Sequence, residues 1–248
     1  MIIPRYRVHA VKLATLTIDR AGVTYGRGYG TKMDIPVWCA AIEGEGRRIL
    51  VDTGIADATK WMPYHPCVVT PLPAALAELG WSLNDVDIVI NSHLHYDHCE
   101  NNIKLPNAQF YVSASEWEFA AHPTETQAWS YNIDWTSPEL TYMNYTMINT
   151  DHYDVCPGIR VIKTPGHTPG HQSVLVNTDE GLVCIAGDAA CVMENLSDRV
   201  PPTVHVSVDE ALRSIDKMCS LADRIFMNHD PDLTDFQNSN FPLVPGHK

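Results

Sequence analysis

Apolar positions recur at two different spacings along the chain, and together they predict a mixed α/β fold. Strand-length apolar runs occur at residues 8–18, 37–42, 48–52, 86–90 and 108–113, and later in GIRVIKT, QSVLVN, LVCIAGD and RIFMNHD. The run VDIVI at 86–90 is continuously apolar, which is typical of a strand covered on both faces. Residues 178–181 (TDEG) separate two of the later runs and predict a hairpin turn.

Helical spacing appears in three places between these runs. PLPAALAELG has two prolines near its start and Gly80 as its C′ residue. Ser113 or Ser115 opens a short helix through residues 116–121, and Ser207 with Glu210 forms a capping-box start to VDEALRSIDKMCSLA. Residues 122–153 follow neither spacing and are predicted to be irregular. Because strands and helices alternate but hairpins interrupt them, we expect a mixed α/β fold in a single domain, 1–248.

Composition and charge exclude several classes of partner. The chain has 248 residues and 45% hydrophobic residues, enough for one sizeable core. Its formal net charge of −13 disfavours nucleic acid and anionic membranes as partners. No apolar run is long enough to span a bilayer, and the start lacks the features of a signal peptide. Seven scattered cysteines without a C-x-x-C pair indicate reduced thiols, so the expected location is cytoplasmic.

The densest group of metal-type ligands lies in NSHLHYDHCENN, directly after the run at 86–90. In an extended segment His93 and His95 project to the same side. Asp97 and His98 follow a turn and can face the same cavity from the start of a helix, where an anionic side chain is favoured. Imidazole and carboxylate are the ligands that zinc prefers at catalytic sites, so the motif predicts a metal site.

Three further candidates each follow a predicted strand. His167 lies in the loop TPGHTPGH, Asp188 ends LVCIAGD, and His229 lies in RIFMNHD. Functional sites of α/β sheets form where strands end. Five histidines and two aspartates are too many for one tetrahedral zinc but suit two metals that share a bridging carboxylate. His171, in the same loop as His167, is expected to orient a ligand or the loop.

These motifs resemble the metallo-β-lactamase superfamily, through HLHYDH, TPGHTPGH, GD and the late NHD. The sequence ILVDTG at 49–54 resembles the first motif of that family, and IPVWCAAIEGEGRRILVDTG, PGIRVIKTPGHTPGHQSVLV and VPPTVHVSVDEALRSI resemble stretches of the N-acyl homoserine lactonases. The resemblance implies the four-layer αββα sandwich, with two mixed sheets between outer helices. It also implies two Zn²⁺ ions, with other divalent transition metals as the alternative.

The resemblance implies a role for each candidate ligand. His93, His95 and His167 would hold one ion, and Asp188 would bridge to the other. The second ion would be held by Asp97, His98 and His229. Asp52, in ILVDTG, would be a buried support for the metal histidines rather than a ligand.

One position departs from the lactonase pattern. Those enzymes usually carry a tyrosine three residues beyond the bridging aspartate, and here that residue is Cys191. A thiol is a poor donor, and losing an oxyanion donor costs about 2.7–4 kcal/mol. Tyr96 could replace the missing hydroxyl or be an apolar wall of the pocket. Cys191 could line the pocket or react itself, while Trp129 and Trp135 could line the substrate pocket, fill the core or contact a second subunit of a homodimer.

The expected reaction is metal-dependent hydrolysis of a small lactone or another ester. A metal lowers the pKa of bound water to about 7, and the resulting hydroxide would attack the carbonyl carbon. Asp97 would pass a proton to the leaving alkoxide. An N-acyl homoserine lactone is the leading substrate, an aromatic or bicyclic lactone and a glyoxalase II-like thioester are the alternatives, and a non-catalytic metal-binding protein is the least favoured.

Overall fold

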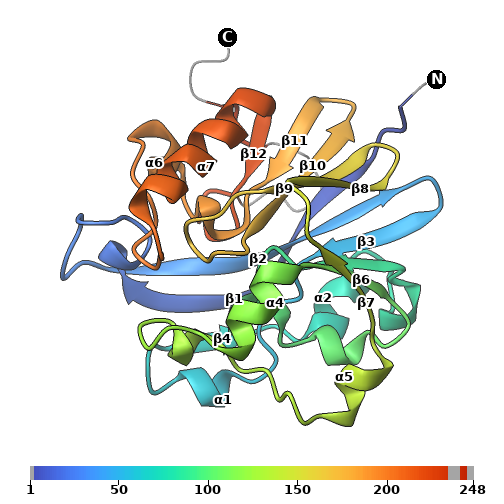
Figure 1. The fold of residues 1–248 in the computed structure, drawn as a ribbon, viewed down its shortest axis with the longest axis horizontal. Coiled ribbons are helices and arrows are strands. Elements are labelled where there is room, and N and C mark those ends of the chain that lie inside the picture. Colours follow the sequence, from blue (N-terminus) through green and yellow to red (C-terminus); the bar gives the residue numbers. More distant parts are fainter. Residues whose placement is uncertain (1–2, 234–240, 245–248) are drawn as a thin grey trace.

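Two β-sheets pack face to face, and helices cover both outer surfaces (Figure 1). The computed structural model describes residues 3–233 and 241–244. Helices α1, α2, α4 and α5 lie on the outer side of one sheet, and α6 and α7 on the outer side of the other. This is the four-layer αββα arrangement that the sequence motifs predict.

The first sheet has seven strands, two of which form a long antiparallel hairpin. In spatial order the strands are β4 (Cys67–Val69), β1 (Arg7–Asp19), β2 (Lys32–Gly44), β3 (Arg47–Val51), β5 (Ile88–Ile90), β6 (Gln109–Ser113) and β7 (Asn144–Ile148). Neighbours from β4 to β3 are antiparallel, and neighbours from β3 to β7 are parallel. The parallel half brings the carboxyl ends of β3 and β5 to one edge.

The second sheet has five strands, in the order β12 (Arg224–Phe226), β11 (Gly181–Ile185), β10 (Gln172–Thr178), β9 (Ile159–Lys163) and β8 (His152–Cys156). β10 and β11 form the predicted hairpin, with Thr178 opposite Gly181. β12 pairs parallel to β11, so both strands end at the same edge. As in the first sheet, two parallel strands therefore place their following loops side by side.

Helices in the described residues are mostly short. The α-helices are α1 (Ala58–Trp61), α2 (Leu72–Ala77), α3 (Tyr96–Cys99), α4 (Ala114–Ala121), α5 (Pro138–Tyr142), α6 (Met193–Ser197) and α7 (Val208–Leu221). Short 3-10 turns are η1 (Arg20–Gly22), η2 (Leu83–Asp85), η3 (Asn102–Lys104), η4 (Ala128–Ser130) and η5 (Gly187–Ala189). Ser207 accepts a hydrogen bond from the backbone N–H of Glu210 at 3.3 Å, which caps α7 as its sequence predicts.

The main core lies between the two sheets. Ile42 and Ile49 from the first sheet pack with Val174 and Phe226 from the second, and all four side chains are buried. The outer faces have their own cores, which join the first sheet to α2 and the second to α7. Burying one such side chain contributes about 1.5–3 kcal/mol, so three stacked cores hold the sandwich together.

The prediction that residues 122–153 are irregular was wrong in part. This stretch contains α5 and β7, and β8 begins at His152. β7 pairs parallel with β6 along five residues, and the ring of Tyr145 lies 5.1 Å from that of Phe110. Only Ile148 of β7 is buried, since β7 is an edge strand, so its sequence lacks the apolar run that identified the inner strands.

Neither membrane-spanning helices nor disulfides are predicted from the sequence. In the described part of the chain, no helix is both long and apolar enough to cross a lipid bilayer. Within the same residues no disulfide joins any two cysteines, as their scattered spacing predicts.

Candidate metal centre

Seven potential ligands meet at the edge where the four strands that precede them end. His93, His95, Asp97 and His98 follow β5, His167 follows β9, Asp188 follows β11, and His229 follows β12. All seven side chains are buried, although they are polar or ionisable. The parallel pairs β3–β5 and β11–β12 bring these loops together from both sheets.

Three histidines form one group at this edge. Ligand atoms of His93, His95 and His167 all lie within 4.8 Å of one another. The Nε2 atom of His167 is 3.0 Å from Nδ1 of His95, and the ring of His93 lies edge-on to both. Such a set of converging imidazoles is what a zinc site with three protein ligands requires.

A second group lies beside the first, and Asp188 stands between them. Asp97, His98 and His229 again have ligand atoms within 4.8 Å of one another. The Oδ1 atom of Asp188 is 3.1 Å from Nε2 of His229 and 3.3 Å from Nε2 of His98. Its other oxygen, Oδ2, is 3.6 Å from Nε2 of His167. One carboxylate oxygen therefore faces each group, which is the geometry of a bridging ligand.

The protein alone does not satisfy the polar atoms at this edge. Counting only the described residues, no hydrogen-bond partner reaches Nε2 of His93 or His98 or Oδ1 of Asp188, although each atom is buried. Buried polar atoms without partners cost about 1–3 kcal/mol each. Divalent metal ions would supply the missing partners, so the residues fit a two-metal centre.

Electrostatics also prepares the imidazoles of His93 and His95 for coordination. Burial, with the neighbouring imidazoles of His98 and His95, holds the pKa of His93 well below its usual value. Burial and His167 do the same for the pKa of His95. Both rings are therefore neutral near pH 7, and a neutral imidazole is the form that binds a metal.

Asp52 orients the rings of His93 and His98 through hydrogen bonds. Its carboxylate accepts hydrogen bonds from the backbone N–H and the hydroxyl of Ser92, both at 2.7 Å, and from Nδ1 of His98 at 2.8 Å. Because the Ser92 hydroxyl donates to Asp52, it accepts from Nδ1 of His93, 3.0 Å away. Both rings thus carry their proton on Nδ1 and leave Nε2 for a metal. Asp52 has a φ of 66°, a conformation that aspartate tolerates better than most residues.

Backbone carbonyls orient two more rings in the same way. Nδ1 of His167 donates to Val204 O at 2.6 Å, and Nδ1 of His229 donates to Pro36 O at 2.8 Å. His171 contacts Asp188 rather than the cavity, because its Nε2 accepts the backbone N–H of Asp188 at 3.0 Å. Burial and the neighbouring His167 lower the pKa of His171 to about 3, so this ring is neutral.

Sequence reasoning missed one buried acid that joins the two ligand loops. The Glu116 carboxylate, on α4, accepts hydrogen bonds from Leu94 N at 3.0 Å, from the Tyr131 hydroxyl at 3.0 Å and from the Thr168 hydroxyl at 2.5 Å. It therefore holds the loop of His93 and His95 against the loop of His167. A single glutamate in a predicted helix gives no pattern that distinguishes it from a solvent-exposed one.

A cavity of about 630 Å³ opens onto the metal groups. Tyr96, Trp129 and Cys191 contribute to its wall, together with aliphatic side chains such as Leu16 and Ile35. The Tyr96 ring stacks on Trp61 at 3.6 Å, and its hydroxyl is 2.8 Å from Nε2 of His65. Trp135 lies outside this wall, with its ring edge-on to Trp117 at 5.0 Å. The wall of the cavity is thus mostly apolar, and His95, Asp97, His167, Asp188 and His229 line it as well.

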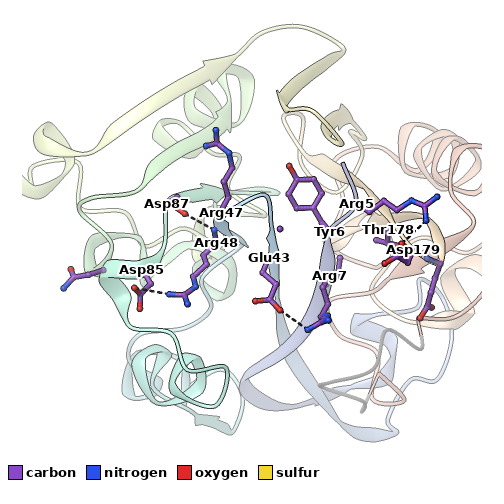
Figure 2. Close-up of a pocket in the computed structure, with 15 residues that line it drawn as sticks. Arg5, Tyr6, Arg7, Glu43, Arg47, Arg48, Asp85, Asp87, Thr178 and Asp179 are labelled. Atoms are coloured by element: carbon purple, nitrogen blue, oxygen red, sulfur yellow. Dashed lines mark hydrogen bonds and ion pairs between the residues drawn. The ribbon is translucent and has the colours of Figure 1, made fainter. Parts of the chain in front are cut away.

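A second hollow, of about 900 Å³, lies at the opposite ends of the strands and has a different character (Figure 2). It is lined by the start of β1, the β2–β3 turn and the β10–β11 turn. Three of its arginines already face carboxylates, in the pairs Arg5–Asp179 at 2.9 Å, Arg7–Glu43 at 3.3 Å and Arg48–Asp85 at 3.0 Å. Because these charges are largely compensated and exposed, we place the functional site at the metal edge.

An αββα sandwich with a histidine- and aspartate-rich centre at one sheet edge defines a class of metal-dependent proteins. Comparison with known families agrees: the chain belongs to the metallo-beta-lactamase superfamily, whose family model matches residues 34–227. This match includes the six ligand candidates from His93 to Asp188 and ends two residues before His229.

Within the superfamily, the chain is similar to lactonases over most of its length. It is 31% identical to the N-acyl homoserine lactonase of Bacillus cereus, covering 90% of this chain and 93% of that protein. It is 29% identical to the N-acyl homoserine lactonase AttM of Rhizobium radiobacter, covering 96% and 97%. A solved structure of an N-acyl homoserine lactone hydrolase, with N-hexanoyl-L-homoserine bound at its catalytic metal center, is similar with a TM-score of 0.75 and 27% identity, covering 94% and 95%.

Proposed function

We propose that this chain is a dinuclear-zinc hydrolase that opens the ring of an N-acyl homoserine lactone or a related small lactone. The observation that carries the proposal is the pair of ligand groups, with buried unpartnered nitrogens, whose residues help to line a mostly apolar cavity. The similarity to lactonases along nearly the whole chain supports the choice of reaction.

In this proposal each ligand group holds one ion. His93, His95 and His167 would hold the first, and Asp188 would contribute one oxygen to each. The second would be held by Asp97, His98 and His229. When bound, two zinc ions would lower the pKa of water to about 7 and polarise the substrate carbonyl.

The remaining chemistry falls to side chains of the cavity. Its aliphatic and aromatic wall would hold the acyl chain and exclude water. Asp97 is 8% exposed on this wall, so its carboxylate can take a proton at the centre and deliver it to the ring oxygen as the carbon–oxygen bond breaks. The product is a hydroxy acid. The Tyr96 hydroxyl would donate to the substrate in place of the tyrosine that Cys191 replaces.

The residues that line the cavity argue against one alternative substrate and support another. Among the described residues that line it, Lys32 is the one Lys or Arg, so it offers little to the two carboxylates of a glutathione thioester. An aromatic or bicyclic lactone remains the second candidate, because Tyr64 and Trp129, whose ring centroids are 6.2 Å apart, both line the cavity. A flat ring could stack against either of them.

A pH-indicator hydrolysis assay on zinc-loaded protein tests the proposal. We expect turnover of acyl-homoserine lactones, a loss of at least about a hundredfold in His95→Ala, and normal turnover in His152→Ala, which alters an exposed histidine of β8. Aromatic and bicyclic lactones, a thioester and a cephalosporin complete the panel. Cleavage of one of these alone would move the substrate and keep the centre, whereas inactivity on every lactone would overturn the lactonase proposal.

A further inference from the structure

We propose that the thiol of Cys191 is a further ligand of the second metal ion, so that this ion has a sulfur donor besides nitrogen and oxygen. The inference rests on the dinuclear centre proposed above. Its basis is a third ligand group: Sγ of Cys191, a carboxylate oxygen of Asp188 and a ring nitrogen of His229 all lie within 4.8 Å of one another. His229 already belongs to the second metal group, Asp188 faces both groups, and Cys191 is 3% exposed.

Hydrogen bonds fix the backbone of Cys191 from both sides. Its N–H donates to Oδ1 of Asn195 at 2.8 Å, and its carbonyl accepts the backbone N–H of His229 at 3.2 Å. Asn195 is itself buried and donates through Nδ2 to Val23 O at 2.8 Å and to Val200 O at 2.9 Å. The segment after η5 is therefore held directly against the loop that carries His229. This arrangement places the sulfur beside the second metal group.

The chemistry of the surroundings favours coordination over a free thiol. Sγ of Cys191 lies beside ligand atoms of Asp188 and His229. A divalent cation at this point would pair with the thiolate, and the thiol proton would leave to solvent. At the same point Oδ1 of Asp188, nine-tenths buried, has no hydrogen-bond partner within the described residues. Oδ1 of Asp188 is therefore an atom beside Cys191 that a cation would satisfy.

A sulfur ligand would also change which metals the second site retains. Thiolate is a soft donor and selects zinc or cobalt over manganese or magnesium, which prefer oxygen. This accounts for a cysteine at a position where the lactonases usually have a tyrosine. In this interpretation Cys191 does not leave a gap in the oxyanion site but completes the metal site.

X-ray absorption spectroscopy of the zinc-loaded protein tests the ligand directly. We expect one sulfur neighbour at about 2.3 Å in addition to nitrogen and oxygen neighbours. In the cobalt-loaded protein we expect a thiolate-to-cobalt charge-transfer band in the near ultraviolet. That band should be lost in Cys191→Ser and in Cys191→Ala. It should persist in Cys67→Ser, a matched control, because Cys67 is buried in the same apolar cluster as Cys191.

Metal content, measured in parallel, separates this inference from the proposed function. Two zinc ions with a sulfur neighbour that disappears in Cys191→Ser support the ligand. Two zinc ions with only nitrogen and oxygen neighbours, or a sulfur signal that survives both Cys191 variants, overturn it and leave the dinuclear hydrolase intact. A chain that binds no stoichiometric metal overturns both.

Discussion

The carboxylate of Asp52 determines which nitrogen of the neighbouring histidines carries the proton. It accepts hydrogen bonds from Ser92, His98 and Asn228, the last at 3.2 Å, and it cannot donate. Because this carboxylate only accepts, His98 must carry its proton on Nδ1. The Ser92 hydroxyl donates to Asp52 and therefore accepts from His93, which must carry its proton on Nδ1 as well. The metal-binding tautomers are thus set by a residue that need not touch a metal.

Replacement of Asp52 by asparagine should therefore weaken the second metal site. The amide keeps the shape of the carboxylate and tolerates the positive φ, but its NH₂ group would face either the Ser92 N–H or the donors of Ser92, His98 and Asn228, so hydrogen bonds that position the ligand loop are lost in both orientations. We expect zinc affinity to fall about 10–100-fold, measured by competition with a chromophoric chelator. Asp34→Asn, at an exposed carboxylate that accepts from Thr17, is the control. Equal affinities in the two variants would exclude this role for Asp52.

The candidate metal ligands could be predicted from the sequence, whereas the residues that support them could not. His93, His167, Asp188 and His229 could be identified because each follows an apolar run that fixes its position at a strand end. Supporting residues such as Glu116 lack that context, and their partners are distant in sequence. Thr168 is 52 residues from Glu116, and nothing in the chain's periodicity links the two.

Helix α4 and the loop after β9 approach each other very closely at Gly170. A Cβ added at Gly170 would lie 2.0 Å from the backbone nitrogen of Glu116 and 2.4 Å from its Cα. These are backbone atoms of a helix, so they cannot move aside as the end of a flexible side chain would. Glycine at this position is what allows Glu116 to reach both ligand loops.

Gly170→Ala should separate these two elements. We expect the free energy of unfolding to fall by at least about 2 kcal/mol, because an added methyl group in a filled space forces the backbone to shift. Urea denaturation followed by circular dichroism measures it. Gly22→Ala is the control, since its Cβ would meet only the tip of the Ile18 side chain at 3.3 Å. Indistinguishable unfolding curves for the two variants would contradict the packing argument.

Element prediction succeeded where burial is two-sided and failed at the edge strands β4, β7 and β8, although the edge strand β12 was predicted correctly. β5 and β10 are buried almost throughout, so their apolar runs could be found in the sequence. β4 and β7 are edge strands with exposed residues, and tertiary pairing rather than local pattern makes them strands. The family motifs supplied the layer order, which periodicity alone does not give.

Across the whole molecule, the proposed centre is where the two sheets meet through ligands. Loops of the first sheet carry His93, His95, Asp97 and His98, and loops of the second carry His167, Asp188 and His229. Bound metal would therefore link the two halves of the sandwich. Without it, the buried unpartnered atoms oppose their closure.

Metal removal should accordingly lower the thermal stability of the entire chain. With zinc at about 1,000 times its Kd, binding adds about 4.1 kcal/mol. For a chain of this size that raises Tm by about 8–16 °C, at about 2–4 °C per kcal/mol. Calorimetry of chelator-treated and zinc-reloaded protein measures the shift, and His95→Ala should show a smaller one. An unchanged Tm in the native chain would mean that the sheets are joined without help from metal.

The hydrogen bond from His229 to Pro36 has a consequence for biosynthesis. It joins residues 193 positions apart, and His229 is the last of the seven ligands in the chain. A nascent chain displays the histidines of the first sheet while the partner that completes their centre is still untranslated. High-affinity capture of the second ion should thus begin only after translation has passed His229, so the growing polypeptide is not locked by that ion into a half-formed structure.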